Sequence, residues 1–176
     1  MTASELHPYR TPADARVGRL ATSSMTLDQQ TELSAAETDA VLGRHETGVL
    51  ALAEADEPYA IPISYGYDAE HRRFYLRLVS TPESEKRRFL SSSPRTRLVV
   101  YEEDDDTYRS VLAIGTLEAV GADDITVEHI VQYGDTKRPL FEMWGRTRDA
   151  LDIELYQLDP EQLTGRRVDL DRTYDE

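Results

Sequence analysis

The chain contains no cysteine among its 176 residues. Disulfide bonds, thiolate zinc sites and thiol catalysis are therefore excluded. It also contains no apolar run near the roughly 20 residues that a membrane-spanning helix requires, and its polar N-terminus shows no signal peptide. We therefore expect a soluble, cytoplasmic protein that does not bind a membrane.

Lysine is almost absent: of 20 basic residues only Lys86 and Lys137 are lysines, against 34 acidic residues and a net charge of -14. An acidic, arginine-rich composition of this kind is typical of a halophilic protein, because concentrated salt screens the repulsion between its carboxylates. The same charge argues against nucleic acid as a partner, since a protein that binds the phosphate backbone needs a basic face.

Common catalytic and metal-binding motifs are missing as well. The sequence has no G-x-x-x-x-G-K-[ST], G-x-S-x-G or H-E-x-x-H pattern, which leaves no basis for phosphate-loop, nucleophile-elbow or zinc-hydrolase chemistry. The acidic run at 102–106 lacks the spacing and the glycine of a calcium loop, so we interpret it as a solvated turn. Four histidines, at positions 7, 45, 71 and 129, have no metal-ligand spacing. We predict no metal site and assign no catalytic residue.

Residues 1–30 are polar and without clear periodicity, and we expect a flexible N-terminal arm followed by a single domain at 31–170. Ser34 and Glu37 form a capping-box pattern, which predicts a helix that ends near Arg44. A second short helix is predicted at Glu85–Ser92, and a third from Asp123 or Asp124 to Gly134.

Between these helices the pattern changes to short runs typical of strands. Six strands are predicted, at Gly48–Glu54, Pro58–Asp68, Arg73–Val79, Thr96–Glu102, Tyr108–Val120 and Ile153–Leu158, the last followed by a short helical turn. Consecutive strands mostly lack a crossover helix, so the spacing favours a small, mostly antiparallel barrel over a doubly wound sheet.

The second predicted strand has one bulky and one nearly flat face. Its odd positions from Tyr59 to Tyr67 carry large side chains, whereas its even positions carry Ala, Pro, Ser and Gly. A flat face allows a planar ligand or another backbone to approach closely, and Pro62 places the strand at an edge or a bulge. The simpler interpretation of this strand alone is an edge strand packed against a helix or a partner subunit.

A basic run stands out in this acidic chain: the stretch Ser80–Phe89 reads STPESEKRRF. A phosphate dianion needs hydroxyls, free N–H groups and cations at one place, and this stretch supplies all three near the start of a helix. Cations at that helix end are unfavourable for the helix itself. The alternative is a solvated run whose cations pair with Glu83 and Glu85.

Four segments in this order, GVLALAE, PYAIPISYGYD, FYLRLVSTPESEKRRFLSSSPRTRLVVYEE and YRSVLAIGTLEAV, resemble the FMN-binding split-barrel proteins related to pyridoxamine 5'-phosphate oxidase. The likeness is to the nitroimidazole-resistance-like branch, and LYQLDPEQLTGRR resembles its closing strand. The resemblance implies a mostly β (α+β) fold, a six-stranded antiparallel split β-barrel with peripheral helices. It also implies a homodimer that holds FMN at the subunit interface.

The resemblance also implies the residues that contact the cofactor. Residues Pro62 to Tyr65 match the strand beside the isoalloxazine ring, and Val79 and Ser80 match a pair that contacts the cofactor. Ser84-Glu85-Lys86 matches a Ser-Arg-Lys phosphate motif, and Ser110 and Val111 match a Gln-Val flavin contact. The implied cofactor-binding residues are Pro62, Ile63, Ser64, Tyr65, Val79, Ser80, Ser84, Lys86, Ser110 and Val111.

The sequence departs from the oxidases at three places. Glu85 replaces an arginine, Ser110 replaces a glutamine, and the C-terminal Arg-Leu-x-Pro segment that binds the vitamin is missing. We therefore expect an FMN-dependent oxidoreductase that acts on a small organic acceptor rather than on vitamin B6. The alternative is a non-catalytic protein that stores flavin or docks a partner, and haem or a deazaflavin is a lesser alternative to FMN.

Overall fold

The computed structural model describes residues 30–91, 95–127, 129, 131 and 152–169. The predicted N-terminal segment at 1–30 lies outside these residues except for Gln30. Of the helix predicted to end at Gly134, the structure describes a 3-10 turn at Ala122–Asp124 and helical positions at Val127, His129 and Val131; its other positions after Val127 lie outside the described residues. The elements are β1 (Gln30–Glu32), α1 (Ala35–Arg44), β2 (Thr47–Glu54), β3 (Glu57–Ser64), β4 (Gly66–Asp68), β5 (Arg73–Ser80), α2 (Glu85–Ser91), β6 (Arg95–Asp104), β7 (Thr107–Ala119) and β8 (Asp152–Asp169).

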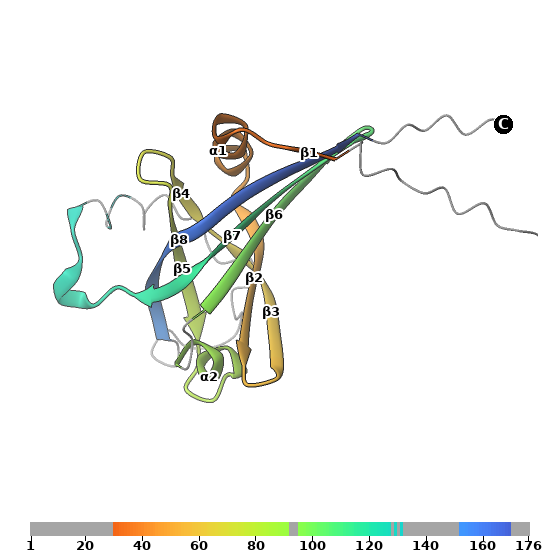
Figure 1. Ribbon diagram of the computed structural model, residues 1–176. Helices are drawn as coiled ribbons and strands as arrows, with labels where there is room; N and C mark the ends of the chain where they lie inside the picture. Colours follow the sequence, from red (N-terminus) through yellow and green to blue (C-terminus); the bar gives the residue numbers. More distant parts are fainter. Residues whose placement is uncertain (1–29, 92–94, 128, 130, 132–151, 170–176) are drawn as a thin grey trace, which may run out of the picture.

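The strands form one antiparallel sheet in the order β3-β2-β6-β7-β8-β5-β4, with β1 paired to β8. β3 and β4 stand at opposite ends of this order, yet Tyr65 alone separates them in the chain. The sheet therefore curls round on itself, as Figure 1 shows. β3 contacts β5, but no ladder joins these two fully described strands, so the barrel is split.

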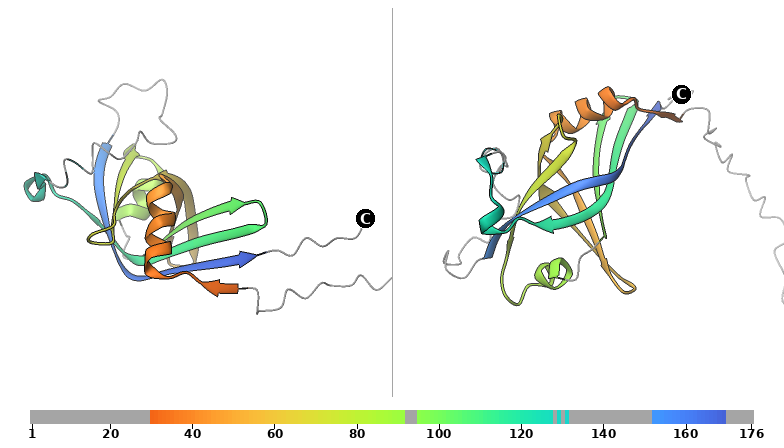
Figure 2. Two further views of the ribbon diagram at one scale, coloured as in Figure 1. Left: turned by 90° about the horizontal axis from the view of Figure 1, so that it is seen from above. Right: turned by 60° about the vertical axis from the view of Figure 1, so that its left-hand side comes forward.

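The helix α1 begins where the capping box predicts. The Glu37 amide donates to the Ser34 hydroxyl at 3.3 Å, and the Ser34 amide donates to the Glu37 carboxylate at 2.8 Å. α1 covers one end of the barrel (Figure 2) and buries Val41 and Leu42 in the core. The Tyr65 hydroxyl donates to the Leu42 carbonyl at 3.0 Å and ties the helix to the strands.

The mostly β class is confirmed, but the structure has eight strands where six were predicted. β1 was missed because its three exposed residues carry no hydrophobic pattern. The second predicted strand divides at Tyr65, because its first part pairs with β2 and its last part with β5. One continuous segment thus becomes two strands when the sheet curls.

β8 corrects the prediction of a helical turn after Leu158. The strand continues through Pro160 to Asp169, and its ladder with β7 shifts register between Ile114 and Gly115. Proline cannot donate to a ladder, and a bulge is the place within a sheet that tolerates it. The bulge allows the strand to continue past a residue that would normally end it.

The β6–β7 hairpin around Asp106, the end of β8 from Arg166 onward, and β1 extend beyond the barrel as a projection of the sheet, called here the arm (residues 30–32, 102–110 and 166–169; Figure 1). One face of the arm turns toward α1, where Glu102 on β6 meets Arg44. The opposite face, which continues onto the barrel wall, is called here the outer sheet face.

Candidate functional site

The turn between β5 and α2 carries the basic run. The Ser84 hydroxyl donates to the Thr81 carbonyl at 2.9 Å and accepts a hydrogen bond from the Arg87 amide at 3.3 Å. Ser84 therefore caps α2, because a side-chain oxygen that accepts from an amide of the first turn satisfies a donor the helix leaves open. Its hydroxyl also fixes the turn against β5.

The three cations of the run have different surroundings. Arg87 pairs with Asp152, and Arg88 pairs with Glu54 at 3.0 Å and Glu57 at 2.9 Å. The interpretation as a charged run with nearby acidic partners therefore holds for both arginines, although their partners come from other strands and not only from the run itself.

Lys86 is the exception. Its ammonium is half-buried and donates to the Val79 carbonyl at 2.8 Å, and no described carboxylate forms an ion pair with it. Burial lowers the pKa of Lys86 below its ordinary value, because desolvation disfavours the charged form. A lysine held in this way gains from an anion that approaches its remaining N–H groups.

Two residues with hydroxyl groups directly follow Val79, whose carbonyl accepts from Lys86. Ser80 and Thr81 are only 4% and 5% exposed, and neither hydroxyl has a hydrogen-bond partner among the described residues. The end of β5 thus brings Val79, Ser80, Ser84 and Lys86 together, as the sequence implies. An ammonium without a counter-ion beside two free hydroxyls is a combination that fits a phosphate group.

The strand β3 has the two faces that the sequence predicts. Tyr59 stacks on Phe89 of α2 with ring centroids 4.7 Å apart, and Ile63 lies in the core. Ala60 and Pro62 are exposed on the other face. β3 is also an edge strand, as Pro62 predicts, so its flat face is available to another molecule.

The flat face continues across the barrel wall. Ladder partners share a face of a sheet, and Pro62 pairs with Val49, Val49 with Val99, and Val99 with Leu112. The three aliphatic side chains are half-buried and do not belong to the core. The outer sheet face therefore carries an apolar band of residues Pro62, Val49, Val99 and Leu112.

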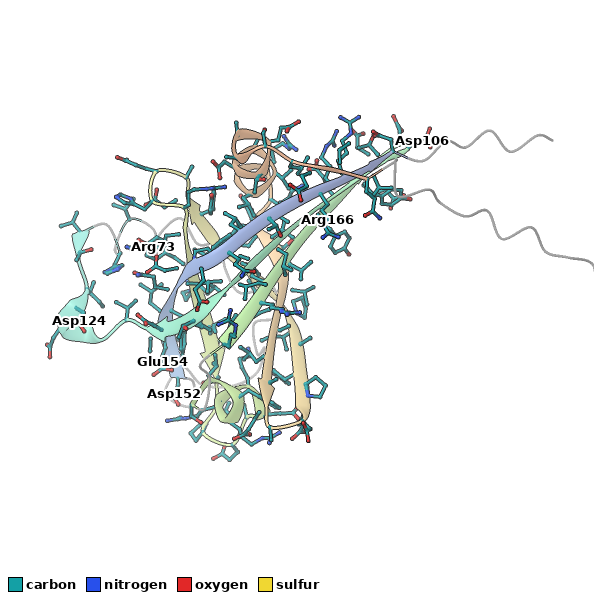
Figure 3. All side chains as sticks on the ribbon, viewed as in Figure 1. Arg73, Asp106, Asp124, Asp152, Glu154 and Arg166 are labelled. Carbon is teal, nitrogen blue, oxygen red and sulfur yellow. The ribbon has the colours of Figure 1, made fainter. Side chains whose placement is uncertain are left out.

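Several implied contact residues turn inward. The side chains of Ile63, Tyr65 and Val111 are in the core, and Ser64 is only 8% exposed. The ladders do not gather Ser110 with the Lys86 group, because Val79 pairs with one end of β8 and Ser110 with the other. In Figure 3 Asp152 lies near α2, whereas Arg166, the ladder partner of Ser110, lies out along the arm.

The structure reveals a cluster that the sequence analysis missed. Glu102 accepts hydrogen bonds from Arg44 at 2.8 Å and Arg109 at 2.9 Å, and its other oxygen lies 2.7 Å from the His45 ring. Burial by itself would raise the pKa of Glu102, but the hydrogen bonds from His45, Arg44 and Arg109 outweigh it and hold that pKa below its ordinary value. Glu102 lies two residues beyond buried Val100 on β6 and therefore shares its face of the strand, and this period of two was the available signal.

These residues line a cleft of about 610 Å³ between α1 and the arm. Its central carboxylate is already neutralised by the surrounding cations, so the cluster ties α1 to the arm. Among the described residues no group of three or more His, Asp or Glu side chains is placed to hold a metal ion, and no described helix has the length and apolar character needed to cross a bilayer.

The family follows from a match over most of the domain. The family model described as pyridoxamine 5'-phosphate oxidase matches residues 34–167, which include α1, the Lys86 turn and nearly all of β8. The chain therefore belongs to the pyridoxamine 5'-phosphate oxidase-like family. No curated protein sequence gives a significant match.

Solved structures with this fold include a provisionally assigned pyridoxamine 5'-phosphate oxidase from Corynebacterium glutamicum, with a TM-score of 0.60 and 20% identity over 82% of this chain and 96% of that one. An FAD-binding protein from Mesorhizobium loti has a TM-score of 0.57 and 23% identity over 79% of this chain and 98% of that one. A provisionally assigned 5-nitroimidazole antibiotic resistance protein from Bacteroides thetaiotaomicron has a TM-score of 0.58 and 13% identity, covering 78% and 87%. At these identities the likeness establishes the split-barrel fold.

Proposed function

We propose that this protein binds FMN and uses it to transfer electrons to a small organic acceptor. The observation that carries the proposal is Lys86, a half-buried ammonium that has no carboxylate partner among the described residues. It lies beside the free hydroxyls of Ser80 and Thr81, in a chain that belongs to a family related to flavin enzymes. Lys86 and these hydroxyls would hold the FMN phosphate.

The residues present fit a flavoprotein in which the flavin supplies the electron chemistry and the protein binds and orients the flavin. The flat face at Ala60 and Pro62 leaves room for a planar ring system beside β3. The protein needs no acid–base pair for this role, and none is assigned. The name of the Mesorhizobium loti protein raises FAD as the competing cofactor.

The visible spectrum of the purified protein tests the cofactor. We expect flavin absorption, either as isolated or after titration with FMN. We also expect tighter binding of FMN than of FAD, because Lys86 would pair with a terminal phosphate dianion, which FMN has and FAD lacks. A preparation that gains no flavin absorption contradicts the proposal, and a Soret band would show haem instead. Reduction of the bound FMN by NADH or NADPH, followed by reoxidation with a nitroaromatic or quinone, tests the electron transfer.

A non-catalytic role in flavin storage or partner docking is the second candidate. The observation that favours it is Glu85, which stands where the oxidases have arginine and lies 3.8 Å from Arg88. A carboxylate next to a phosphate site weakens it. Tightly bound FMN that no nicotinamide reduces at a measurable rate would favour this candidate over the oxidoreductase.

We also propose that the protein is a homodimer. The apolar band at Pro62, Val49, Val99 and Leu112 and the flat edge at Ala60 are open to solvent in the single chain, and a second copy with the same face would cover both. Light scattering of the FMN-loaded protein at molar salt should give twice the 20.0 kDa of one chain. A species of 20.0 kDa alone would contradict the dimer.

A further inference from the structure

Two arginines on the outer sheet face have no partner among the described residues. Every other described lysine or arginine forms an ion pair, a hydrogen bond or another interaction, but Arg97 on β6 and Arg166 on β8 are exposed and have none with a described residue. In a chain with 34 acidic residues and 20 basic ones, arginines without a carboxylate are the exception. An exposed charge contributes little to folding stability, so binding a ligand through either arginine would cost the fold little.

Arg166 belongs to a row of three hydrogen-bond donors. Tyr101 on β6 pairs with Ser110 on β7, and Ser110 pairs with Arg166 on β8. Ladder partners share a face, with Cβ atoms about 4.5–5.5 Å apart. The Tyr101 and Ser110 hydroxyls also lack partners among the described residues, and Tyr101 is 68% exposed. The row therefore presents a guanidinium and two hydroxyls side by side to solvent.

The nearest acidic side chains leave this row open. Glu32 of β1 stands opposite Arg166 in the ladder, yet no ion pair joins the two. Glu103, two residues beyond Tyr101 on the same face, accepts a hydrogen bond from the Tyr108 hydroxyl at 2.5 Å. Among the described residues no carboxylate therefore occupies the guanidinium donors of Arg166.

An apolar surface adjoins the row. Val99 lies two residues from Tyr101 on β6, and Leu112 lies two residues from Ser110 on β7, so both point to the same face. Arg97 lies on the far side of Val99. The arrangement suits a molecule with a flat apolar body and an anionic oxygen group, because arginine binds carboxylate and phosphate through two parallel hydrogen bonds.

We propose that the substrate of the flavin site is a planar organic anion whose carboxylate or phosphate is bound by Arg166 and the two hydroxyls of the row. The apolar part of the substrate lies on Val99 and Leu112, at the end of the apolar band away from Pro62, where the flavin ring is proposed to lie. In the proposed homodimer the second copy would enclose the substrate against this band. This inference rests on the proposed function and adds the chemical class of the acceptor. It also gives Ser110, which the resemblance places near the flavin, a role with the substrate.

The test compares matched probes at one fixed ionic strength. 4-Nitrobenzoate and 4-nitrophenyl phosphate carry the anionic group, and 4-nitrobenzamide is the neutral control of similar shape. Equilibrium dialysis against the full-length protein, with and without FMN, should show at least one anion bound about tenfold or more tightly than the amide. Preference for the carboxylate or the phosphate identifies the anionic group. Equal affinity for all three probes would overturn the inference.

Arg166→Gln and a matched control locate the site. The substitution should lower the affinity for the anion about tenfold or more and leave the affinity for the amide unchanged. Arg95→Gln is the control, since Arg95 on β6 is also exposed but pairs with Glu161 at 3.0 Å. This substitution should change neither affinity. An Arg166→Gln variant that binds the anion normally but dissociates the dimer would show that Arg166 pairs with the second copy, which overturns the proposal.

FMN titration of the same samples distinguishes a failure of the proposed function from a failure of the inference about the substrate. If FMN binds normally and the probes do not distinguish charge, the substrate inference alone is wrong. If no FMN binds, the proposed function is wrong, and the dialysis without FMN still decides whether the row binds anions.

Discussion

At the residue scale, Lys86, Arg87 and Arg88 are adjacent in the chain but differ in what their side chains meet. The two arginines reach carboxylates on other strands, whereas the Lys86 ammonium turns back to the Val79 carbonyl. Successive residues of a helix point in directions about 100° apart, which places the three cations on different sides of α2. One of them is therefore free to bind a ligand while its neighbours stabilise the fold.

Lys86→Ala tests this difference. The substitution should weaken FMN binding about ten- to a hundredfold, because a charge-assisted contact to phosphate contributes about 1.5–3 kcal/mol. Riboflavin lacks the phosphate, so its affinity should change little. Fluorescence titration with both flavins measures the contrast, and Arg88→Ala, which removes a cation already paired with Glu54 and Glu57, is the control. Equal losses for FMN and riboflavin would contradict the phosphate role.

The lowered pKa of Glu102 makes the stability of the protein depend on pH in the acidic range. Its folded-state pKa is held below the ordinary value of 4.5, so its contribution to stability is present above about pH 4.5 and is lost as the pH falls through the lower folded-state pKa. Glu102→Gln should lower the free energy of unfolding at pH 7 by about 1.5–3 kcal/mol. The variant should also lose less stability than the parent below pH 4.5.

Urea unfolding at several pH values measures this effect. Glu118→Gln is the control, because Glu118 is exposed on β7 and should leave both the stability and its pH dependence unchanged. If the free energy of unfolding changes with pH in the same way for the parent and for Glu102→Gln, the Glu102 carboxylate does not contribute to the loss of stability in acid.

At the element scale, two glycines occupy opposite environments. Gly43 lies in α1, and a Cβ added there would meet nothing within 4 Å. Gly115 lies at the β7–β8 register shift, where an added Cβ would stand 2.4 Å from the Asp159 carbonyl oxygen. The close approach of two backbones at the bulge requires glycine, whereas the helix position does not.

Alanine substitutions should therefore act in opposite directions. Gly43→Ala should raise the free energy of unfolding by about 0.5–1 kcal/mol, because alanine loses less conformational entropy than glycine in a helix. Gly115→Ala should lower it by about 1–3 kcal/mol, because the strands must separate at the bulge. Thermal unfolding of the two variants and the parent gives the sign of each change in stability. A Gly115→Ala variant as stable as the parent would mean that the bulge relaxes to accommodate the Cβ.

At the scale of the whole molecule, the net charge of -14 predicts a protein that depends on salt. Raising KCl from about 0.1 M to about 2 M shortens the Debye length from about 10 Å to below 3 Å and screens the repulsion between surface carboxylates. Each 1 kcal/mol regained raises the midpoint temperature by about 2–4 °C for a chain of this size. We expect a rise of about 5 °C or more in thermal unfolding.

Sucrose is the control for this measurement, because it is excluded from the protein surface but does not screen charge. A midpoint that rises as much in sucrose of equal osmolality as in KCl, or that falls in KCl, would contradict an electrostatic origin.

Features that depend on neighbours in the chain could be predicted from the sequence. The capping box at Ser34 and Glu37 starts α1 because its partners are three residues apart. The alternation from Tyr59 to Tyr67 predicts an edge strand with one flat face because side-chain direction follows residue number. The apolar strand runs and the basic run at Lys86 were visible for the same reason, and with them the class of fold and one part of the candidate site.

Features that depend on distant segments were decided by the tertiary structure. The division of one predicted strand into β3 and β4 follows from the curl of the sheet, and the continuation of β8 past Pro160 needs the bulge opposite Ile114 and Gly115. The acidic run was expected to be a solvated turn, yet Glu102 meets Arg44 more than 50 residues away in the chain. The row of Tyr101, Ser110 and Arg166 exists only because two ladders bring residues of three strands into register. Local propensity carries no information about which strands pair, and pairing determines which side chains share a surface.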